Sequence, residues 1–248
     1  MPKHWGGTAH ALINLTTCRY VKIHNMTIIN SWTSGIWLSD CPYCIVNNNY
    51  FENNRIVSVA IRDNTSLADA ESGIVTDNII KAYGVLGIEC LFGVSDVSIS
   101  NNFIESTGDS YKFPSYAFDG TYPDVYPKDT TFNRPTSPNY INPAQLGDGS
   151  CIELTGKYTD VTSDYNNTII INGNTCNSGM CGVRCEEMSM MATVSNNAIR
   201  NCQEGIFLFS ANNITCTGNA IRRCVNGIRT DAMIDPAYNI IIDGNIIE

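Results

Sequence analysis

Apolar and polar positions alternate in short segments along the chain, and each segment ends at a tight turn. The segment reads apolar, any, apolar, any, then Asn, Gly or Asp, then Asn, any, apolar. It occurs at residues 21–28, 44–51, 73–80, 97–104, 169–176, 192–199, 214–221 and 240–247. Alternation with a period of two is typical of β-strands. The fifth position holds only residues that tolerate a left-handed backbone, so each segment predicts a strand, a tight turn and a second strand.

A second repeated strand follows each turn by nine or ten residues and usually reads Gly, apolar, variable, apolar. Clear instances occupy residues 35–38, 87–90, 182–185, 205–208 and 227–230, and weaker ones occupy residues 58–61 and 151–154. Three short strands per repeat, with coils of 22 to 24 residues in the regular part, predict a right-handed parallel β-helix of about eight coils. Coils stacked about 4.8 Å apart would form a rod of about 38 Å. A leucine-rich repeat is excluded because the chain has only 9 Leu and the repeat lacks a helical segment.

The sixth position of the repeat is Asn in seven of its eight occurrences. We expect these side chains to point inward and to stack as a ladder that hydrogen-bonds the turn backbone of neighbouring coils. Because no coil can bury its own apolar face, the stack as a whole forms the core.

The Gly-Ile-x-Leu strand together with the Asn-turn strand resembles the pectate-lyase-like superfamily, which includes pectate lyases, polygalacturonases and phage tailspike depolymerases. The resemblance covers roughly residues 16–248 apart from one insertion. It implies a single β-helix domain over residues 1–248, and it is most similar to the phage tailspike polysaccharide depolymerases. A homotrimer is the assembly that this resemblance implies.

Composition supports an all-β chain and excludes several classes of function. The sequence contains 30 Ile and 29 Asn against 9 Glu, so helix-forming residues are scarce. Its net charge of −9 argues against a nucleic-acid or anionic-membrane binder, which would need a basic face. No stretch reaches the roughly 18 apolar residues that a membrane-spanning helix needs. The start of the chain shows no signal peptide. A virion tail or an extracellular setting is what the resemblance to tailspike depolymerases implies.

One insertion interrupts the repeat. From Asn102 to Ile152 the count is 50 residues where other coils use 9 or 10, and residues 106–148 hold eight of the chain's 20 Tyr and Phe. Loops beyond about 15 residues are usually functional or disordered, and the aromatic content argues against disorder. We expect either a loop that packs on the rod for stability or one wall of a carbohydrate-binding groove, with Tyr116 and Tyr122 as candidate sugar contacts.

The variable position of the Gly-apolar-X-apolar strand should point outward and form the face of that groove. Down the coils this position is occupied by Trp37, Ala60, Glu89, Glu153, Arg184, Phe207 and Arg229. Two residues later the outward set continues with Ser39, Arg62, Leu91, Thr155, Glu186 and Phe209. Carboxylates, arginines and large aromatics are unusual on a soluble rod and fit sugar binding. Candidate substrate-binding residues are therefore Trp37, Arg184, Glu186, Phe207 and Arg229, beside the two tyrosines of the insertion.

Glu89 and Glu153 should occupy successive coils although 64 positions separate them in the sequence. Strand spacing places their carboxyl groups about 5–7 Å apart, where repulsion raises one pKa and creates a general acid. Paired carboxylates are what glycoside hydrolysis needs, although this separation leaves the stereochemical outcome open. Asp148, at the edge of the same strand, is a third catalytic candidate. No cofactor and no metal is expected.

Three alternatives stay open at this stage. The carboxylates and Arg184 can form a surface ladder that neutralises itself and has no catalytic role. A polysaccharide lyase acting on uronates would instead use a base such as Arg184, Arg229 or Lys157. A carbohydrate-binding or structural fibre rod is the third alternative. The ends of a solenoid expose unpaired backbone and apolar core. We therefore also expect that the chain is either part of a longer protein or has its ends covered by partner chains.

Overall fold

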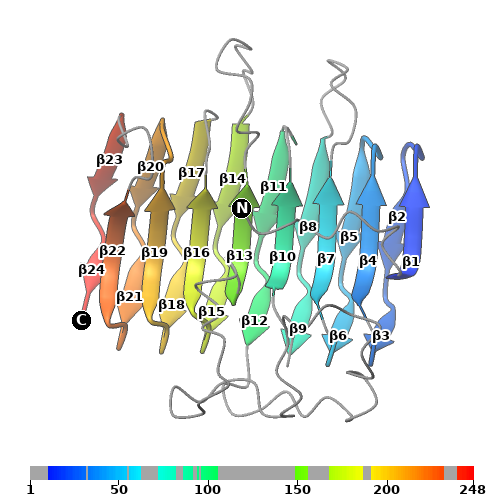
Figure 1. Ribbon diagram of the computed structural model, residues 1–248, viewed down its shortest axis with the longest axis horizontal. Coiled ribbons are helices and arrows are strands. Elements are labelled where there is room, and N and C mark those ends of the chain that lie inside the picture. The colour runs from blue at the N-terminus through cyan, green and yellow to red at the C-terminus, as the bar shows by residue number, and fades with distance from the viewer. Residues whose placement is uncertain are drawn as a thin grey trace, which may run out of the picture.

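The computed structural model describes residues 11–31, 33–54, 56–62, 72–81, 86–91, 94, 96–105, 149–155, 168–186, 191–231 and 239–248. These residues form a right-handed parallel β-helix of three sheets with eight strands each, stacked as a rod (Figure 1). The predicted architecture of three strands per coil and about eight coils is confirmed. Within the described residues there is no helix, and so none that could span a membrane.

The first sheet carries the Gly-apolar-X-apolar strands. Its strands, in spatial order, are β1 (Ala11–Thr16), β4 (Ser34–Ser39), β7 (Val57–Arg62), β10 (Leu86–Leu91), β13 (Ser150–Thr155), β16 (Cys181–Glu186), β19 (Glu204–Phe209) and β22 (Asn226–Asp231).

The other two sheets flank each turn of the repeat. The second contains β2 (Lys22–His24), β5 (Cys44–Asn47), β8 (Gly73–Thr76), β11 (Val97–Ser100), β14 (Thr168–Asn172), β17 (Met191–Ser195), β20 (Ile214–Thr217) and β23 (Ile240–Asp243). The third contains β3 (Thr27–Ile29), β6 (Tyr50–Glu52), β9 (Ile79–Lys81), β12 (Phe103–Glu105), β15 (Thr175–Asn177), β18 (Ala198–Arg200), β21 (Ala220–Arg222) and β24 (Ile246–Ile247).

The turn between the second and third sheets has the geometry that its sequence predicts. The fifth repeat position has a positive φ in every coil, for example 56° at Asn25 and 68° at Gly173. The asparagine that follows is buried in six coils and partly buried at Asn245, and these side chains form the predicted ladder. The Asn174 amide donates to Asn197 Oδ1 at 2.9 Å, and Asn197 Nδ2 donates to Asn219 Oδ1 at 3.0 Å. Each coil is thereby hydrogen-bonded to the next inside the rod.

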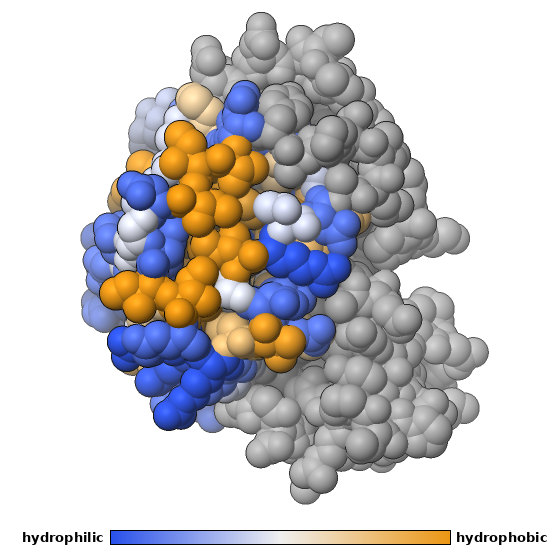
Figure 2. All heavy atoms as spheres, turned by 90° about the vertical axis from the view of Figure 1, so that its left-hand side faces the viewer, coloured by the Kyte–Doolittle hydropathy of each residue, from blue (hydrophilic) through white to orange (hydrophobic). Residues whose placement is uncertain are grey.

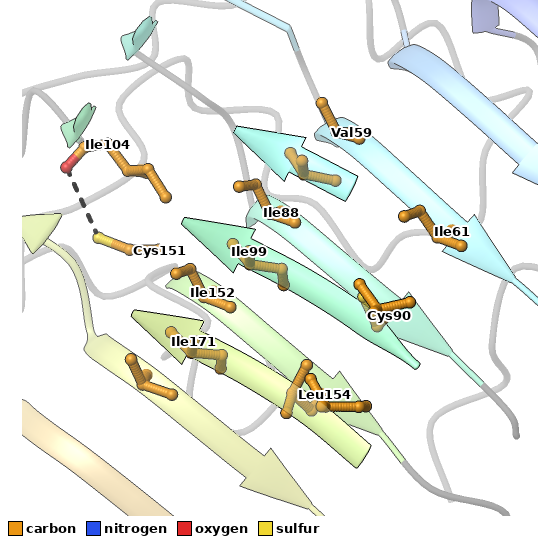
Figure 3. Packing of buried hydrophobic residues seen from close by; sticks show 14 of the residues in the cluster. Val59, Ile61, Ile88, Cys90, Ile99, Ile104, Cys151, Ile152, Leu154 and Ile171 are labelled. Carbon is orange, nitrogen blue, oxygen red and sulfur yellow. Dashed lines mark hydrogen bonds between the residues drawn. The ribbon is translucent and has the colours of Figure 1, made fainter. Parts of the chain in front are cut away.

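The core fills the space enclosed by the three sheets. Ile152 and Leu154 of β13 are fully buried and belong to one cluster with Ile99 of β11 and Ile171 of β14 (Figure 3). Cys151 of β13 also belongs to this core, and its thiol lies 3.9 Å from the Ile104 carbonyl oxygen. Parallel strands that keep their register from coil to coil let β-branched side chains stack in columns, which explains the abundance of isoleucine.

The C-terminal end of the rod presents apolar side chains on its surface (Figure 2). Exposed fractions there are 78% for Val225, 58% for Ile241, 50% for Ile242, 55% for Ile246 and 54% for Ile247. The strands at this end, β22, β23 and β24, are each the last of their sheet, so one backbone edge of each has no neighbouring strand among the described residues.

Candidate functional site

The two candidate carboxylates are neighbours on adjacent strands of the first sheet. Strands β10 and β13 pair in parallel with Glu89 in register with Glu153, although 64 positions separate them in the sequence. The 40-odd extra residues are inserted between these two strands along the chain, and they do not disturb the register of the pairing. Adjacent coils therefore hold the two carboxylates side by side, as predicted.

The rest of the column follows the predicted order. Towards the N-terminal end, Glu89 is in register with Ala60, and Ala60 with Trp37. Towards the C-terminal end, the register runs from Glu153 through Arg184 and Phe207 to Arg229. The carboxylate pair thus occupies the middle of the face, with an aromatic residue two coils away on either side.

This face is more deeply buried than outward-pointing positions would suggest. The expectation of an exposed, solvent-facing column is wrong for Ala60, Glu153 and Arg184, whose exposed fractions are 0%, 5% and 7%. Ala60 is covered because it packs in a separate apolar cluster with Val57 and Leu86. Glu153 and Arg184 are large side chains that pack against their own neighbours along the strands. Trp37, Glu89, Phe207 and Arg229 retain partial exposure.

Glu153 is a buried carboxylate with hydrogen-bond donors on both oxygens. Ser150 Oγ donates to Oε2 at 3.1 Å, and Thr155 Oγ1 donates to Oε1 at 3.3 Å. Burial raises the pKa of Glu153 to about 7, against the opposing effects of the Arg184 charge and of the two hydroxyl donors. These three groups favour the ionised form.

Glu89 is half-buried, and it receives less help for a negative charge than Glu153 does. Burial and the neighbouring Glu153 raise the pKa of Glu89 to about 8, with the Arg62 charge acting in the opposite direction. Two adjacent carboxyl groups with unequal surroundings share protons unequally, so Glu89 holds the proton while Glu153 ionises.

From Glu153 towards the C-terminal end, the outward column continues with an arginine, a phenylalanine and a second arginine. Arg184 Nη2 pairs with Glu186 Oε2 at 2.7 Å, and Arg229 pairs with Glu204 at 3.2 Å and with Asp231 at 2.8 Å. The Phe207 ring lies between the two guanidinium groups, whose Cζ atoms are 5.5 Å and 5.1 Å from its centroid.

Several candidates lie outside the described residues, and two contributors were missed by sequence reasoning. The former are Asp148, Tyr116 and Tyr122, with the rest of the insertion at residues 106–148, and Lys157. The missed contributors are Ser150 and Glu204, whereas Thr155 had been placed on the face without a role. Ser150 and Glu204 occupy equivalent positions at the start of their strands, three residues before the outward column. A search for polar residues at that position would have found both.

The described residues show no other candidate centre on this face. They contain no group of three or more His, Cys, Asp or Glu side chains that could hold a metal ion. A shallow depression lined by Asn25, Asn48 and Asp77 lies at the turn between the second and third sheets, away from the carboxylate pair.

Comparisons with known proteins identify the architecture. A family model for a right-handed beta helix region matches residues 4–108, and a model described as periplasmic copper-binding protein (NosD) matches residues 128–248. The described residues offer no ligand set for the copper named in the second description.

Among curated proteins nothing matches the chain. A solved structure described as the complex of XylC with xylose is similar at 10% identity and a TM-score of 0.36. The alignment covers 81% of this chain and 36% of that one, so the chain spans about a third of its length. A likeness at this level bears on neither fold nor chemistry.

Proposed function

We propose that this chain is a glycoside hydrolase, because a right-handed β-helix, to whose family model residues 4–108 are similar, is typical of polysaccharide-acting enzymes. One observation carries the proposal. Glu89 and Glu153 are in register on adjacent strands, and their unequal surroundings separate a protonated carboxyl from an ionised one. Glycosidases of the two-carboxylate type need such a pair on either side of the bond that they break.

The roles follow from the surroundings of each group. Glu89 donates its proton to the glycosidic oxygen as the sugar–oxygen bond breaks, so the leaving sugar departs as an alcohol. Glu153, held by Ser150 and Thr155, supplies the carboxylate. Carboxyl groups on adjacent strands lie about 5–7 Å apart, between the separations of retaining and inverting enzymes, so this spacing leaves the stereochemical outcome open. Glu153 acts either as the nucleophile, forming a glycosyl ester that water hydrolyses with Glu89 as base, or as the base that activates the attacking water.

Replacing either carboxyl group by an amide tests the proposal. Glu89→Gln and Glu153→Gln should each lower turnover by about 100-fold or more, because the amide can neither donate the proton nor attack. The assay incubates the protein with a panel of bacterial surface polysaccharides and measures new reducing ends. Glu105→Gln is the matched control, since Glu105 is a half-buried carboxyl on the third sheet that accepts a hydrogen bond from Asn177.

Two results would overturn the assignment. One is full activity of both Gln variants on a polysaccharide that the wild type cleaves. The other is loss of activity accompanied by loss of the β-sheet circular dichroism signal, which would make the pair part of the scaffold. Unsaturated products absorbing near 235 nm would indicate the alternative reaction, a lyase, and binding without any product would indicate a carbohydrate-binding rod.

The proposal includes a setting outside the cytoplasm, on an extracellular particle such as a phage tail or free in the medium. It is supported by the similarity of residues 128–248 to a family described as periplasmic. Bacterial surface glycan is therefore the substrate class to test first.

A further inference from the structure

We propose that the sugars bound between β13 and β22 carry no acidic group, so that the substrate is an uncharged or amino-substituted glycan and not a polyuronate. This inference rests on the proposed function, because it concerns the glycan that reaches Glu89 and Glu153. It reverses what the arginines of this face suggest at first sight, since arginine is the usual partner of a sugar carboxylate.

One end of Arg184 is already paired within the protein, while its buried Nε atom has no hydrogen-bond partner among the described residues. Its side chain is 8% exposed and its Nη2 atom lies 2.7 Å from Glu186 Oε2. The charge of Arg184 also lowers the pKa of Glu153. The Cζ atom of Arg184 lies 5.5 Å from the centroid of the Phe207 ring. A uronate carboxylate would have to displace Glu186 to form a two-pronged pair with this arginine.

Arg229 is more exposed, at 45% of its side chain, and it is paired with two carboxylates. Its Nη1 atom lies 3.2 Å from Glu204 Oε1, and its Nη2 atom lies 2.8 Å from Asp231 Oδ2. Glu204 receives a further hydrogen bond from Asn226 Nδ2 at 3.0 Å. Both terminal nitrogens of Arg229 are therefore paired with acids of the protein.

The charge balance of the whole face points the same way. The eight strands of the first sheet contain three arginines and five acidic residues, namely Arg62, Arg184 and Arg229 against Glu89, Glu153, Glu186, Glu204 and Asp231. Even with Glu89 protonated, four carboxylates face three guanidinium groups. In a partly buried setting, where charges are weakly screened, a uronate would meet net repulsion.

Two buried atoms on this face have no hydrogen-bond partner among the described residues: Glu204 Oε2, which accepts, and Arg184 Nε, which donates. A sugar hydroxyl can both donate and accept, whereas a ligand carboxylate suits Arg184 Nε alone. A carboxylate oxygen accepts hydrogen bonds and cannot pair with another carboxylate at neutral pH. A sugar hydroxyl or amino group, which can donate, complements it, and the half-buried rings of Phe207 and Phe209, 5.8 Å apart, offer apolar contact for a sugar ring.

The test compares glycans that differ only in charge. Oligogalacturonate, oligomannuronate and hyaluronan hexamers are each paired with their carboxyl-reduced counterpart, in which every carboxylate is a hydroxymethyl group. Binding to the full chain is measured by calorimetry at about 20 and 200 mM salt. At least one reduced glycan should bind about 10-fold or more tightly than its charged parent, and the gap should narrow at high salt because the repulsion is screened. Tighter binding of a charged parent, or no binding of any reduced glycan, overturns the inference.

A second measurement changes the protein instead of the glycan. Asp231→Asn and Glu186→Gln each remove a carboxylate that pairs with an arginine, and Asp231 is exposed enough for its variant to fold. Both variants should bind the charged hexamers at least about 3-fold more tightly than the wild type, and no gain would contradict the inference. The binding measurements test the charge preference whether or not any hexamer is cleaved. If no hexamer is cleaved, that result counts against the proposed hydrolase only, and the charge preference is still decided by binding.

Discussion

Ser150, Thr155 and Arg184 give Glu153 surroundings that Glu89 does not share, and this difference sets the expected pH dependence of activity. Glu153 must be ionised and Glu89 protonated for the proposed reaction. With pKa values of about 7 for Glu153 and about 8 for Glu89, the profile of kcat/KM against pH should be bell-shaped with its maximum between these values. Because the two carboxyl groups interact, the two apparent pKa values read from the profile describe the pair and not the individual residues.

Arg184 should control one limb of that profile. Its charge lowers the pKa of Glu153, so Arg184→Met should move the acidic limb to higher pH and leave the basic limb nearly in place. A parallel loss of activity at all pH values, with both limbs unmoved, would show instead that Arg184 serves only the packing of the face. Kinetics from pH 5 to 9 distinguish these outcomes.

The same two carboxyl groups should make the folded protein less stable as the pH rises. Their folded-state pKa values lie above the ordinary value of 4.5, so between about pH 4.5 and 8 the folded state binds more protons than the unfolded state. The free energy of unfolding must then fall with rising pH across this window. Thermal melts of the wild type should show that decline, and the Glu89→Gln, Glu153→Gln double variant should show a flatter curve. Equal slopes for both proteins would contradict the raised pKa values.

At the scale of the repeated element, the asparagine ladder should carry measurable stability. Asn197→Ala removes the acceptor for the Asn174 amide at 2.9 Å and the donor to the Ile171 carbonyl at 3.1 Å. Buried backbone groups left without partners cost about 1–3 kcal/mol of the free energy of unfolding. Denaturant melts should show this loss, while the specific activity of the folded fraction stays unchanged.

Asn245→Ala is the matched control for the ladder. Asn245 is the last member and is partly exposed, so water can replace its bonds to Asn219 and to the Cys216 carbonyl. We expect it to lose clearly less stability than Asn197→Ala. Equal losses at both positions would mean that the ladder bonds are not what stabilises the stack.

The repeated element is also where the sequence was most informative. The positive-φ position recurs in every coil and the asparagine after it in seven of eight, because backbone geometry favours these residues there, so both could be recognised without a structure. Register between Glu89 and Glu153 followed from the same repeat. Burial did not follow, because alternation shows only which way a side chain points. Glu153 at 5% exposed is covered by neighbours three residues before and two after it in its own strand, and by Arg184 of the next strand.

For the whole molecule, exposed apolar side chains predict association. Ile241 and Ile246 are 58% and 55% exposed. Exposed apolar patches favour pairing with another chain. Light scattering should give a mass above 27.2 kDa, and a homotrimer is the assembly that we propose. Ile241→Lys with Ile246→Lys should shift the mass towards the monomer, whereas a soluble wild-type monomer would contradict the prediction.

The ladder bond between Asn102 and Asn174 joins residues 72 positions apart, whereas the bond between Asn197 and Asn219 joins residues 22 apart. A solenoid folds by adding one coil to the next, so each step closes a loop as long as one repeat. Loop-closure entropy grows with the logarithm of loop length, and the longer step costs about 1 kcal/mol more than an ordinary one. Growth that starts in either half should therefore pause at the boundary between β12 and β13. The proposed catalytic pair straddles that boundary, so the site would be assembled only when the two halves of the rod have joined.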